Sequence, residues 1–390
     1  MDQPTSRHDV VVVGARAAGA ATAMLLARSG LDVLVVDRSR YGADTLSTHA
    51  LMRGGDDLVE QAPPVELDDA AGTPAVRRTR FTYASDEVTV TIKPTHGVDA
   101  LYAPRRTVLD PILVDAASAA GAQVRFGTTV GGITRDRQGR VDGVVGRDAD
   151  GQQVRHAAGL VIGADGLFSA VARAVDAPVE RSGTGATSIV YGYWPDLEVD
   201  GYHWVFRRDA AAGIIPTNDG LCCVFAAATP DGMGSGGLDG LRRVVRRADP
   251  AVGDQVASAS PVAGVRGFRG VPGHLRVPCG PGWALVGDAG YWKDPIGAHG
   301  LTDALRDAEL LARAVIAAAA AGGEPAALDQ YHQIRNQLSV PLFDVVDAIA
   351  GMRWTDAEIP ELLLRLNSAM TDEVELLAHL GDERALVGLR

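Results

Sequence analysis

The chain has 390 residues, 46% of them hydrophobic, and a formal net charge of −12. Its length exceeds that of a usual single core, so we expect one large or two closely joined domains with room for a buried cofactor. Acidic residues outnumber basic ones 49 to 37, which argues against nucleic acid as a partner because binding to a phosphate backbone depends on clustered cations.

The three cysteines form no structural pattern. Cys222 and Cys223 are adjacent and Cys279 is distant, which fits neither a disulfide framework nor a zinc site. The N-terminus enters a predicted strand without an apolar signal segment, and the alanine-rich stretch 310–323, which contains Arg313, is too short to cross a bilayer. We therefore expect a cytoplasmic protein without metal or integral membrane association, as a monomer or homodimer.

The first strong motif is a strand, turn, helix and strand pattern over residues 9–38. The apolar run Val10–Val13 is typical of a strand buried on both faces. Gly14 and Gly19 bracket the turn that leads into the predicted helix. The whole pattern predicts a dinucleotide-binding unit.

The second strand of this unit ends at Asp37, where a carboxylate can accept hydrogen bonds from the ribose hydroxyls of an ADP group. We also assign the adjacent Arg38 to the cofactor site. Arg16 departs from the fingerprint, because a glycine normally stands there and lets the backbone approach a pyrophosphate. Two interpretations stay open: Arg16 points away, or its guanidinium binds the phosphates or ring edge of the cofactor.

A second sheet is predicted from two other parts of the chain. Residues 76–97 alternate between polar and apolar in the manner of an antiparallel hairpin, and residues 179–278 lack the pattern of parallel units. The division that follows is a discontinuous cofactor-binding domain over 1–75, 98–178 and 279–345, an inserted antiparallel substrate domain over 76–97 and 179–278, and a C-terminal helical segment over 346–390. The fold class is therefore α/β.

Three separated segments together carry a family resemblance. They are "GARAAG" at 14–19, "GADG" at 163–166, and "GDAG" with "PIGAHGLTDAL" between 287 and 305. In order and spacing the chain resembles the single-component FAD-dependent aromatic hydroxylases, the p-hydroxybenzoate hydroxylase family, over roughly residues 8–345. Geranylgeranyl reductases and flavin-dependent halogenases share this FAD scaffold. The resemblance implies a Rossmann-like domain that holds FAD non-covalently on a parallel sheet.

The resemblance also implies which residues hold the flavin. In the family the aspartate of the third segment, here Asp288, binds the ribityl chain, and the loop after it wraps the isoalloxazine ring. Glycines there let backbone N–H groups approach the pyrimidine edge, and the helix that begins near Leu301 directs its positive end at the negative charge of reduced flavin. The implied contacts of this segment are Gly287, Asp288, Pro295, Gly297, Gly300, Leu301 and Thr302.

Further site residues follow from the same resemblance. Asp165 and Gly166 resemble the family's middle fingerprint near the FAD pyrophosphate, and Arg106 aligns with a residue on the ribityl side. His49, by its spacing from the second strand, stands where the family has an arginine that moves with the pyridine nucleotide. The alternative is that Ser47–His49 caps the next helix.

The lone histidine of the flavin loop, His299, stands where the family often has lysine or glutamine. It is one candidate catalytic residue and His49 is the other. The alternative interpretation is that the His299 imidazole fills the loop and bonds to the backbone.

No second glycine-rich unit is present for a nicotinamide cofactor. The resemblance implies that NAD(P)H docks transiently as co-substrate, and that reduced flavin and O2 form a C4a-hydroperoxide. This species would hydroxylate or epoxidise a small aromatic or polyketide-like substrate of natural-product biosynthesis. The aromatic residues between 191 and 206 either roof the substrate pocket or form plain core.

Two alternatives to oxygenation remain. The segment "YHWVFR" at 202–207 is similar to the Tyr-x-Trp-x-Phe-Pro segment of geranylgeranyl reductases, with Arg207 in place of the proline. This favours an FAD-dependent reductase or dehydrogenase as the first alternative, and a non-catalytic flavin-binding protein is the second. The Trp-x-Trp-x-Ile-Pro segment and catalytic lysine of the halogenases are not found, so halogenation ranks last.

Overall fold

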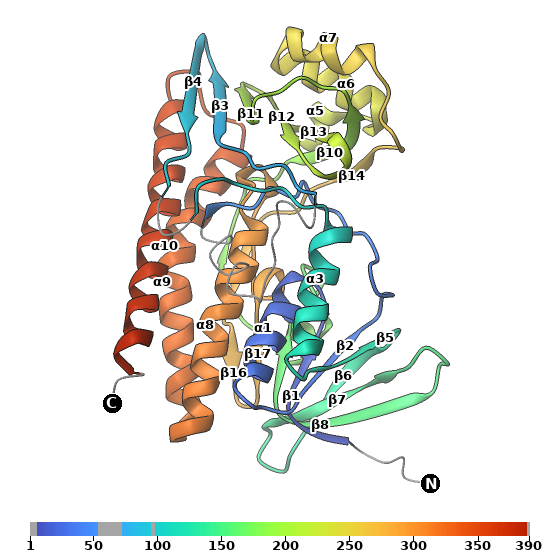
Figure 1. Cartoon of the computed structure of the whole chain (residues 1–390), viewed down its shortest axis with the longest axis vertical. Helices are drawn as coiled ribbons and strands as arrows, with labels where there is room; N and C mark the ends of the chain where they lie inside the picture. Colours follow the sequence, from blue (N-terminus) through green and yellow to red (C-terminus); the bar gives the residue numbers. More distant parts are fainter. Residues whose placement is uncertain (1–5, 54–71, 95–97, 388–390) are drawn as a thin grey trace.

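An eight-stranded mixed sheet forms the lower part of the molecule in Figure 1, a computed structural model that describes residues 6–53, 72–94 and 98–387. Its path runs β16-β17-β8-β1-β2-β5, and β6 and β7 continue from β8. The strands are β1 (Ser6–Val13), β2 (Val33–Asp37), β5 (Gln123–Phe126), β6 (Thr129–Arg135), β7 (Val141–Arg147), β8 (Gln153–Gly163), β16 (Cys279–Gly280) and β17 (Trp283–Leu285).

The centre of this sheet is parallel because β1 is apolar on both faces. Val10–Val13 pairs in parallel with Val33–Val36 on one side and with Leu160–Gly163 on the other. The helices α1 (Ala17–Arg28), α3 (Arg106–Ala119) and α8 (Gly300–Ala321) contribute to the same apolar cluster as Val10 and Val12. The predicted parallel layer with its crossover helix is confirmed.

A seven-stranded sheet lies in the upper part of Figure 1, in the order β14-β10-β13-β12-β11-β3-β4. Its strands are β3 (Arg78–Tyr83), β4 (Asp86–Thr91), β10 (Ser188–Pro195), β11 (Tyr202–Arg207), β12 (Ala210–Pro216), β13 (Leu221–Ala228) and β14 (Arg266–Phe268). All neighbours are antiparallel except β3 and β11, which run parallel. The predicted second sheet is confirmed, with this one parallel pair as a departure.

The two faces of the seven-stranded sheet bury different residues. Val190 and Trp194 pack on the amphipathic α6 (Gly237–Ala248), which lies with α5 (Pro230–Met233) and α7 (Pro250–Ser258) beyond the outer face. Tyr191 and Tyr193 belong to the inner face, whose cluster also includes Ile296 of the loop before α8. Of the two interpretations of the aromatic residues between 191 and 206, plain core therefore holds for Trp194, because alternate residues of a strand point to opposite faces.

Two long helices complete the chain. α9 (Glu324–Ala350) and α10 (Ile359–Val387) run side by side along one flank of the molecule in Figure 1, and the predicted C-terminal helices are confirmed. A small sheet of β9 (Val179–Ser182), β15 (His274–Arg276) and β18 (Tyr291–Trp292) joins strands from three parts of the sequence, and α4 (Ala170–Ala174) follows β8. Within the described residues, no helix has the length and apolar character needed to cross a membrane.

The fold class predicted from the sequence is confirmed: a parallel-containing sheet with covering helices, a second, mostly antiparallel sheet, and C-terminal helices. The exact domain boundaries stay a prediction.

Candidate functional site

The turn after β1 holds two sequence motifs against each other. Gly14 has a φ of +110°, and a Cβ there would lie 2.3 Å from the carbonyl oxygen of Ala164 in the second motif. A Cβ on Gly19 would lie 1.9 Å from the carbonyl oxygen of Gly14. Both glycines are therefore required for the close approach of the turn, α1 and the end of β8.

Asp37 organises this turn through its carboxylate. Oδ2 accepts a hydrogen bond from the Ala15 backbone N–H at 2.7 Å, and Oδ1 accepts from the backbone N–H and the hydroxyl of Ser39. Asp37 also lines a small hollow together with Ala15, Arg16, Ser39 and Asp110, among other residues. The acid thus fixes the loop around a concave surface, while the neighbouring Arg38 is exposed.

Arg16 does not point away from this hollow. Its guanidinium lies 3.6 Å from Asp110 of α3, and Asp110 also accepts a hydrogen bond from Arg106 at 2.8 Å. The two arginines therefore converge on one buried carboxylate at the start of α3. Burial lowers the pKa of Arg16, and the adjacent Arg106 lowers it further.

The second motif has a structural role that the sequence did not reveal. Asp165 accepts hydrogen bonds from the Ser169 hydroxyl at 2.5 Å and from the Ala170 N–H at 2.6 Å. Its carboxylate therefore stabilises the first turn of α4. Gly166 next to it has a φ of +77° and open space where a Cβ would stand.

The third motif follows β17 in a short 3-10 turn, η2 (Gly287–Ala289). Gly287 has a φ of +59°, and a Cβ there would lie 3.0 Å from Ala18 of α1. The next residue, Asp288, is half-buried, and burial raises the pKa of its carboxyl to about 6, partly offset by the nearby charges of Lys293 and Arg106. Ionisation of this carboxyl is therefore unfavourable compared with that of an exposed aspartate.

The flavin loop, which we define as residues 293–302, is held rigidly at its base and open at its tip. Asp294 caps the 3-10 turn η3 (Pro295–Gly297) by accepting from the Ile296 N–H, and it also accepts two hydrogen bonds from Thr187. Gly297 packs so closely that a Cβ would lie 2.7 Å from Val346. Gly300, in contrast, is exposed, with no heavy atom within 4 Å of a Cβ.

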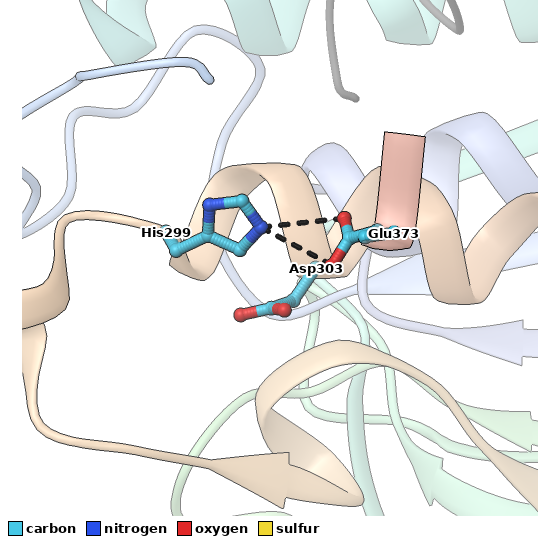
Figure 2. A group of neighbouring side chains, drawn as sticks. All are labelled: His299, Asp303 and Glu373. Atoms are coloured by element: carbon cyan, nitrogen blue, oxygen red, sulfur yellow. Dashed lines mark hydrogen bonds and ion pairs between the residues drawn. The ribbon is translucent and has the colours of Figure 1, made fainter. Parts of the chain in front are cut away.

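Within this loop, His299 is the N-cap residue of α8 and is 2% exposed. Its Nε2 lies 3.3 Å from both carboxylate oxygens of Glu373, which comes from α10 (Figure 2). The alternative that His299 bonds to the backbone is therefore wrong, because its partner is a buried side chain 74 residues away.

Around His299 lies a buried cluster of charged side chains. The fully buried Arg306 donates to Asp303 at 3.0 Å, to Glu373 at 3.0 Å and to Asp307 at 2.7 Å. The ammonium of Lys293 pairs with Asp303. His299, Asp303 and Glu373 each offer a ligand atom within 4.8 Å of the others, but the carboxylates already hold these two cations. The arrangement is that of an ion-pair network.

The segment around His49 contacts both β10 of the seven-stranded sheet and the start of α8. His49 is 1% exposed, has a φ of +69°, and its Nε2 is hydrogen bonded to the Tyr193 hydroxyl of β10. Three residues later, the Met52 N–H donates to the Thr302 hydroxyl in the first turn of α8 at 2.9 Å. The segment that carries His49 thus lies between the inner face of the seven-stranded sheet and the flavin loop. The Ser47 hydroxyl accepts from the His49 N–H, which makes a local turn.

The surroundings of His49 are electropositive. Burial lowers the pKa of its imidazole to about 3, and Arg106, Arg105 and Arg266 lower it further. The Arg105 guanidinium lies over the Tyr193 ring, 4.7 Å from its centroid. Burial also raises the pKa of Tyr193. The imidazole and the phenol are both neutral at neutral pH.

A larger hollow of about 290 Å³ lies elsewhere, lined by Arg7, Val10, Arg140, Glu324 and neighbouring residues. It is at the edge where the parallel strands begin. Ligands of open α/β sheets bind at the opposite edge, where the strands end, so we do not assign this hollow to the cofactor.

Comparison with known proteins decides the family. The model of a family described as an FAD binding domain matches residues 7–344. The chain belongs to this FAD-binding family. It is an FAD-dependent flavoprotein of the oxidoreductase class, in agreement with the resemblance carried by the three glycine-rich segments.

The relatives of this flavoprotein have different activities. It is 29% identical over 325 residues to the menaquinone reductase of Mycolicibacterium smegmatis, covering 79% of this chain and 76% of the relative. It is 30% identical over 320 residues to digeranylgeranylglycerophospholipid reductase 2 of Methanopyrus kandleri (76% and 74%), and 28% identical over 325 residues to the 6-methylpretetramide 4-monooxygenase of Streptomyces rimosus (77% and 73%). The chain spans about half the length of the FixC protein of Salmonella typhimurium, to which it is also similar.

Solved structures agree on the fold. A flavin-dependent brominase superposes with a TM-score of 0.78 at 16% identity, covering 97% of this chain and 100% of the other. At that identity the likeness concerns the fold alone.

The residues of this flavoprotein fit FAD. The hollow beside Asp37 and Arg16 lies at the positive end of α1, where backbone N–H groups can bind a phosphate. Gly166 and Gly300 leave open space where a side chain would otherwise stand. The individual contacts assigned from the sequence stay predictions.

Proposed function

We propose that this flavoprotein is a monooxygenase that uses NAD(P)H and O2 to hydroxylate or epoxidise a small aromatic or polyketide-like substrate, bound through an anionic oxygen such as a phenolate or enolate. The observation that carries the proposal is the buried His49–Tyr193 pair between the flavin loop and the sheet. FAD, when bound, supplies the electron transfer and the activation of oxygen.

The tautomer of His49 follows from its partner. If the Tyr193 hydroxyl donates to Nε2, the proton of the neutral imidazole resides on Nδ1. Nδ1 is buried and has no hydrogen-bond partner among the described residues. A buried N–H without an acceptor costs free energy, so the site favours a ligand that brings an oxygen there.

The charges around this N–H favour an anion over a neutral ligand. Arg105, Arg106 and Arg266 are the groups whose charges act on His49. Each has a carboxylate partner, yet their summed effect at the imidazole is positive. A positive potential lowers the pKa of a bound phenol, and the resulting phenolate ring is more electron-rich and more reactive toward an electrophilic oxygen.

The experiment compares phenols with their methyl ethers, which have the same ring but no ionisable oxygen. We expect phenols to bind the FAD-loaded protein more tightly, and turnover with NADPH under ¹⁸O2 to give a product with one labelled oxygen. His49→Asn keeps a residue that tolerates positive φ but removes the imidazole, so it should abolish the preference for phenols. His203→Asn, on the same sheet but paired with Asp200, is the matched control. Equal binding of phenols and ethers would contradict the proposal.

A reductase of the geranylgeranyl reductase type is the second candidate. Tyr202, Trp204 and Phe206 of the similar segment are buried on the same inner face as Tyr193. Two of the relatives named above are reductases. The two candidates differ in product, because a reductase adds two hydrogens to its substrate and leaves it without labelled oxygen.

A further inference from the structure

The C-terminal helix reaches the flavin loop through one buried carboxylate. Glu373 of α10 is 1% exposed and contacts His299 (Figure 2). It also forms an ion pair with Arg306. Burying an ionised glutamate is unfavourable unless its charge is paired. Arg306 already has two other carboxylate partners, Asp303 and Asp307. The pairing of Glu373 with His299 therefore needs an explanation beyond the neutralisation of Arg306.

We propose that His299, held by Glu373, takes up one proton from solvent when the flavin is reduced and returns it when the flavin is oxidised. The inference rests on FAD binding and on the contact of the flavin loop with the isoalloxazine ring. It does not depend on oxygenation, so it holds equally for a monooxygenase and for a reductase.

The geometry fixes where the proton goes. Because Arg306 keeps Glu373 ionised, the carboxylate can only accept, and Nε2 of His299 must be the nitrogen that carries hydrogen. Nδ1 is then the nitrogen with the free lone pair. It is buried and has no hydrogen-bond partner among the residues that the structure describes. His299 therefore has one vacant proton position.

The charge balance of the cluster gives the reason for uptake. Two cations, Lys293 and Arg306, face three carboxylates, Asp303, Asp307 and Glu373. From the elements packed around them, Arg335 of α9 is paired with Glu180, Arg106 of α3 is paired with Asp110, Asp288 adds an acid, and Tyr291 is neutral.

The cluster is thus already negative when the flavin is oxidised. A further negative charge on the reduced flavin would be unfavourable at low dielectric unless a proton enters with it.

The pKa directions agree with this charge balance. Burial lowers the pKa of His299, against the raising effect of Glu373, so the imidazole is neutral at neutral pH while the flavin is oxidised. A new negative charge nearby raises that pKa. Lys293 is the competing acceptor, because burial and Arg306 lower its pKa to about 7.

The proposed step balances in electrons and protons. A hydride donor such as NAD(P)H delivers two electrons and one proton to the flavin and leaves as the oxidised nicotinamide. The second proton passes from solvent to Nδ1 of His299, and no other bond changes. Two electrons are then accompanied by two protons instead of one.

The test measures the midpoint potential of the bound FAD against pH, from about pH 6 to about pH 9, anaerobically and without substrate. For a two-electron couple each proton contributes about 30 mV per pH unit. We expect the wild-type potential to fall by about 60 mV per pH unit between the pKa that His299 has beside oxidised flavin and its higher pKa beside reduced flavin. The potential of His299→Asn should fall by about 30 mV per pH unit over the whole range. His332→Asn, on α9 at a half-buried histidine that pairs with Glu180, should match the wild type.

A second variant keeps the proposal falsifiable if His299→Asn does not retain FAD. Glu373→Gln removes the negative charge that stabilises the imidazolium form of His299. In this variant the region where the midpoint potential falls by about 60 mV per pH unit should therefore move to lower pH. Equal slopes in wild type and His299→Asn, an unshifted Glu373→Gln profile, or a wild-type slope of about 30 mV would overturn the proposal. A flattened slope in Lys293→Gln together with a steep one in His299→Asn would overturn the assignment to His299. Because no oxygen or substrate is present, none of these results bears on the monooxygenase proposal.

Discussion

Replacing Gly300 with valine should weaken FAD binding while leaving the fold intact. Gly300 is exposed at the first position of α8, and the space around its Cβ position is open, so the side chain itself meets no protein atom. Valine has a better helix propensity than glycine by several tenths of a kcal/mol, so the free energy of unfolding of the FAD-free protein should not fall.

The expected loss of FAD affinity depends on which group occupies the open space beside Gly300. If the flavin edge lies there, the isopropyl group displaces one or two hydrogen bonds to backbone N–H groups, at roughly 1 kcal/mol or more each. That corresponds to an increase in Kd on the order of tenfold to a hundredfold. Fluorescence titration of the apoprotein with FAD measures it.

Gly131→Val is the matched control for this titration, because Gly131 is also exposed and open but lies on β6, away from the loop. An FAD affinity of Gly300→Val equal to that of the control and the wild type would refute our account of the loop.

Three further predictions concern the same region. Asp37→Ala should cost about 1–3 kcal/mol of unfolding free energy by leaving the buried Ala15 N–H without its acceptor, and should also weaken FAD binding, both checked by urea unfolding and FAD titration. Arg306→Met should destabilise the FAD-free protein by about 3–5 kcal/mol because it strands buried carboxylates, whereas Arg246→Met at an exposed ion pair should be nearly neutral in the same assay. Burial raises the pKa of Asp288 from 3.8 to about 6, so its contribution to stability is complete below about pH 4 and is lost as pH rises through about 6, on the order of 3 kcal/mol. Asp288→Asn should remove that loss, so its free energy of unfolding should exceed that of the wild type at neutral pH but not at about pH 4. Equal free energies of unfolding at neutral pH would contradict the reasoning.

The parts of the fold that were predictable are those with local signals. The unbroken apolar run of β1 followed by a glycine is typical of a strand buried on both faces, and the glycines after it and after β17 occupy positions where a side chain would clash or the φ is positive. The helix α6 also had a local signal that we missed, since Leu241, Val244, Val245 and Ala248 follow helical spacing and are all buried.

The most informative part of the site has no local signal. Glu373 lies in a polar stretch of α10, and nothing in its sequence neighbours indicates that it pairs with a histidine 74 residues earlier. Likewise, the hydrogen bond between His49 and Tyr193 spans 144 residues and depends on how the backbone around His49 packs on the inner face of the sheet. Such contacts follow from tertiary packing, and a pattern of spacing cannot supply them.

The central claim is that this flavoprotein activates oxygen, and rapid mixing tests it most directly. Holoprotein reduced anaerobically is mixed with O2 in the absence of substrate, and the flavin absorbance is followed. Our account predicts two phases, with a transient spectrum that differs from those of both reduced and oxidised flavin and with hydrogen peroxide released only in the second phase. Reoxidation in a single phase, with peroxide formed at the same rate and no transient, would contradict it.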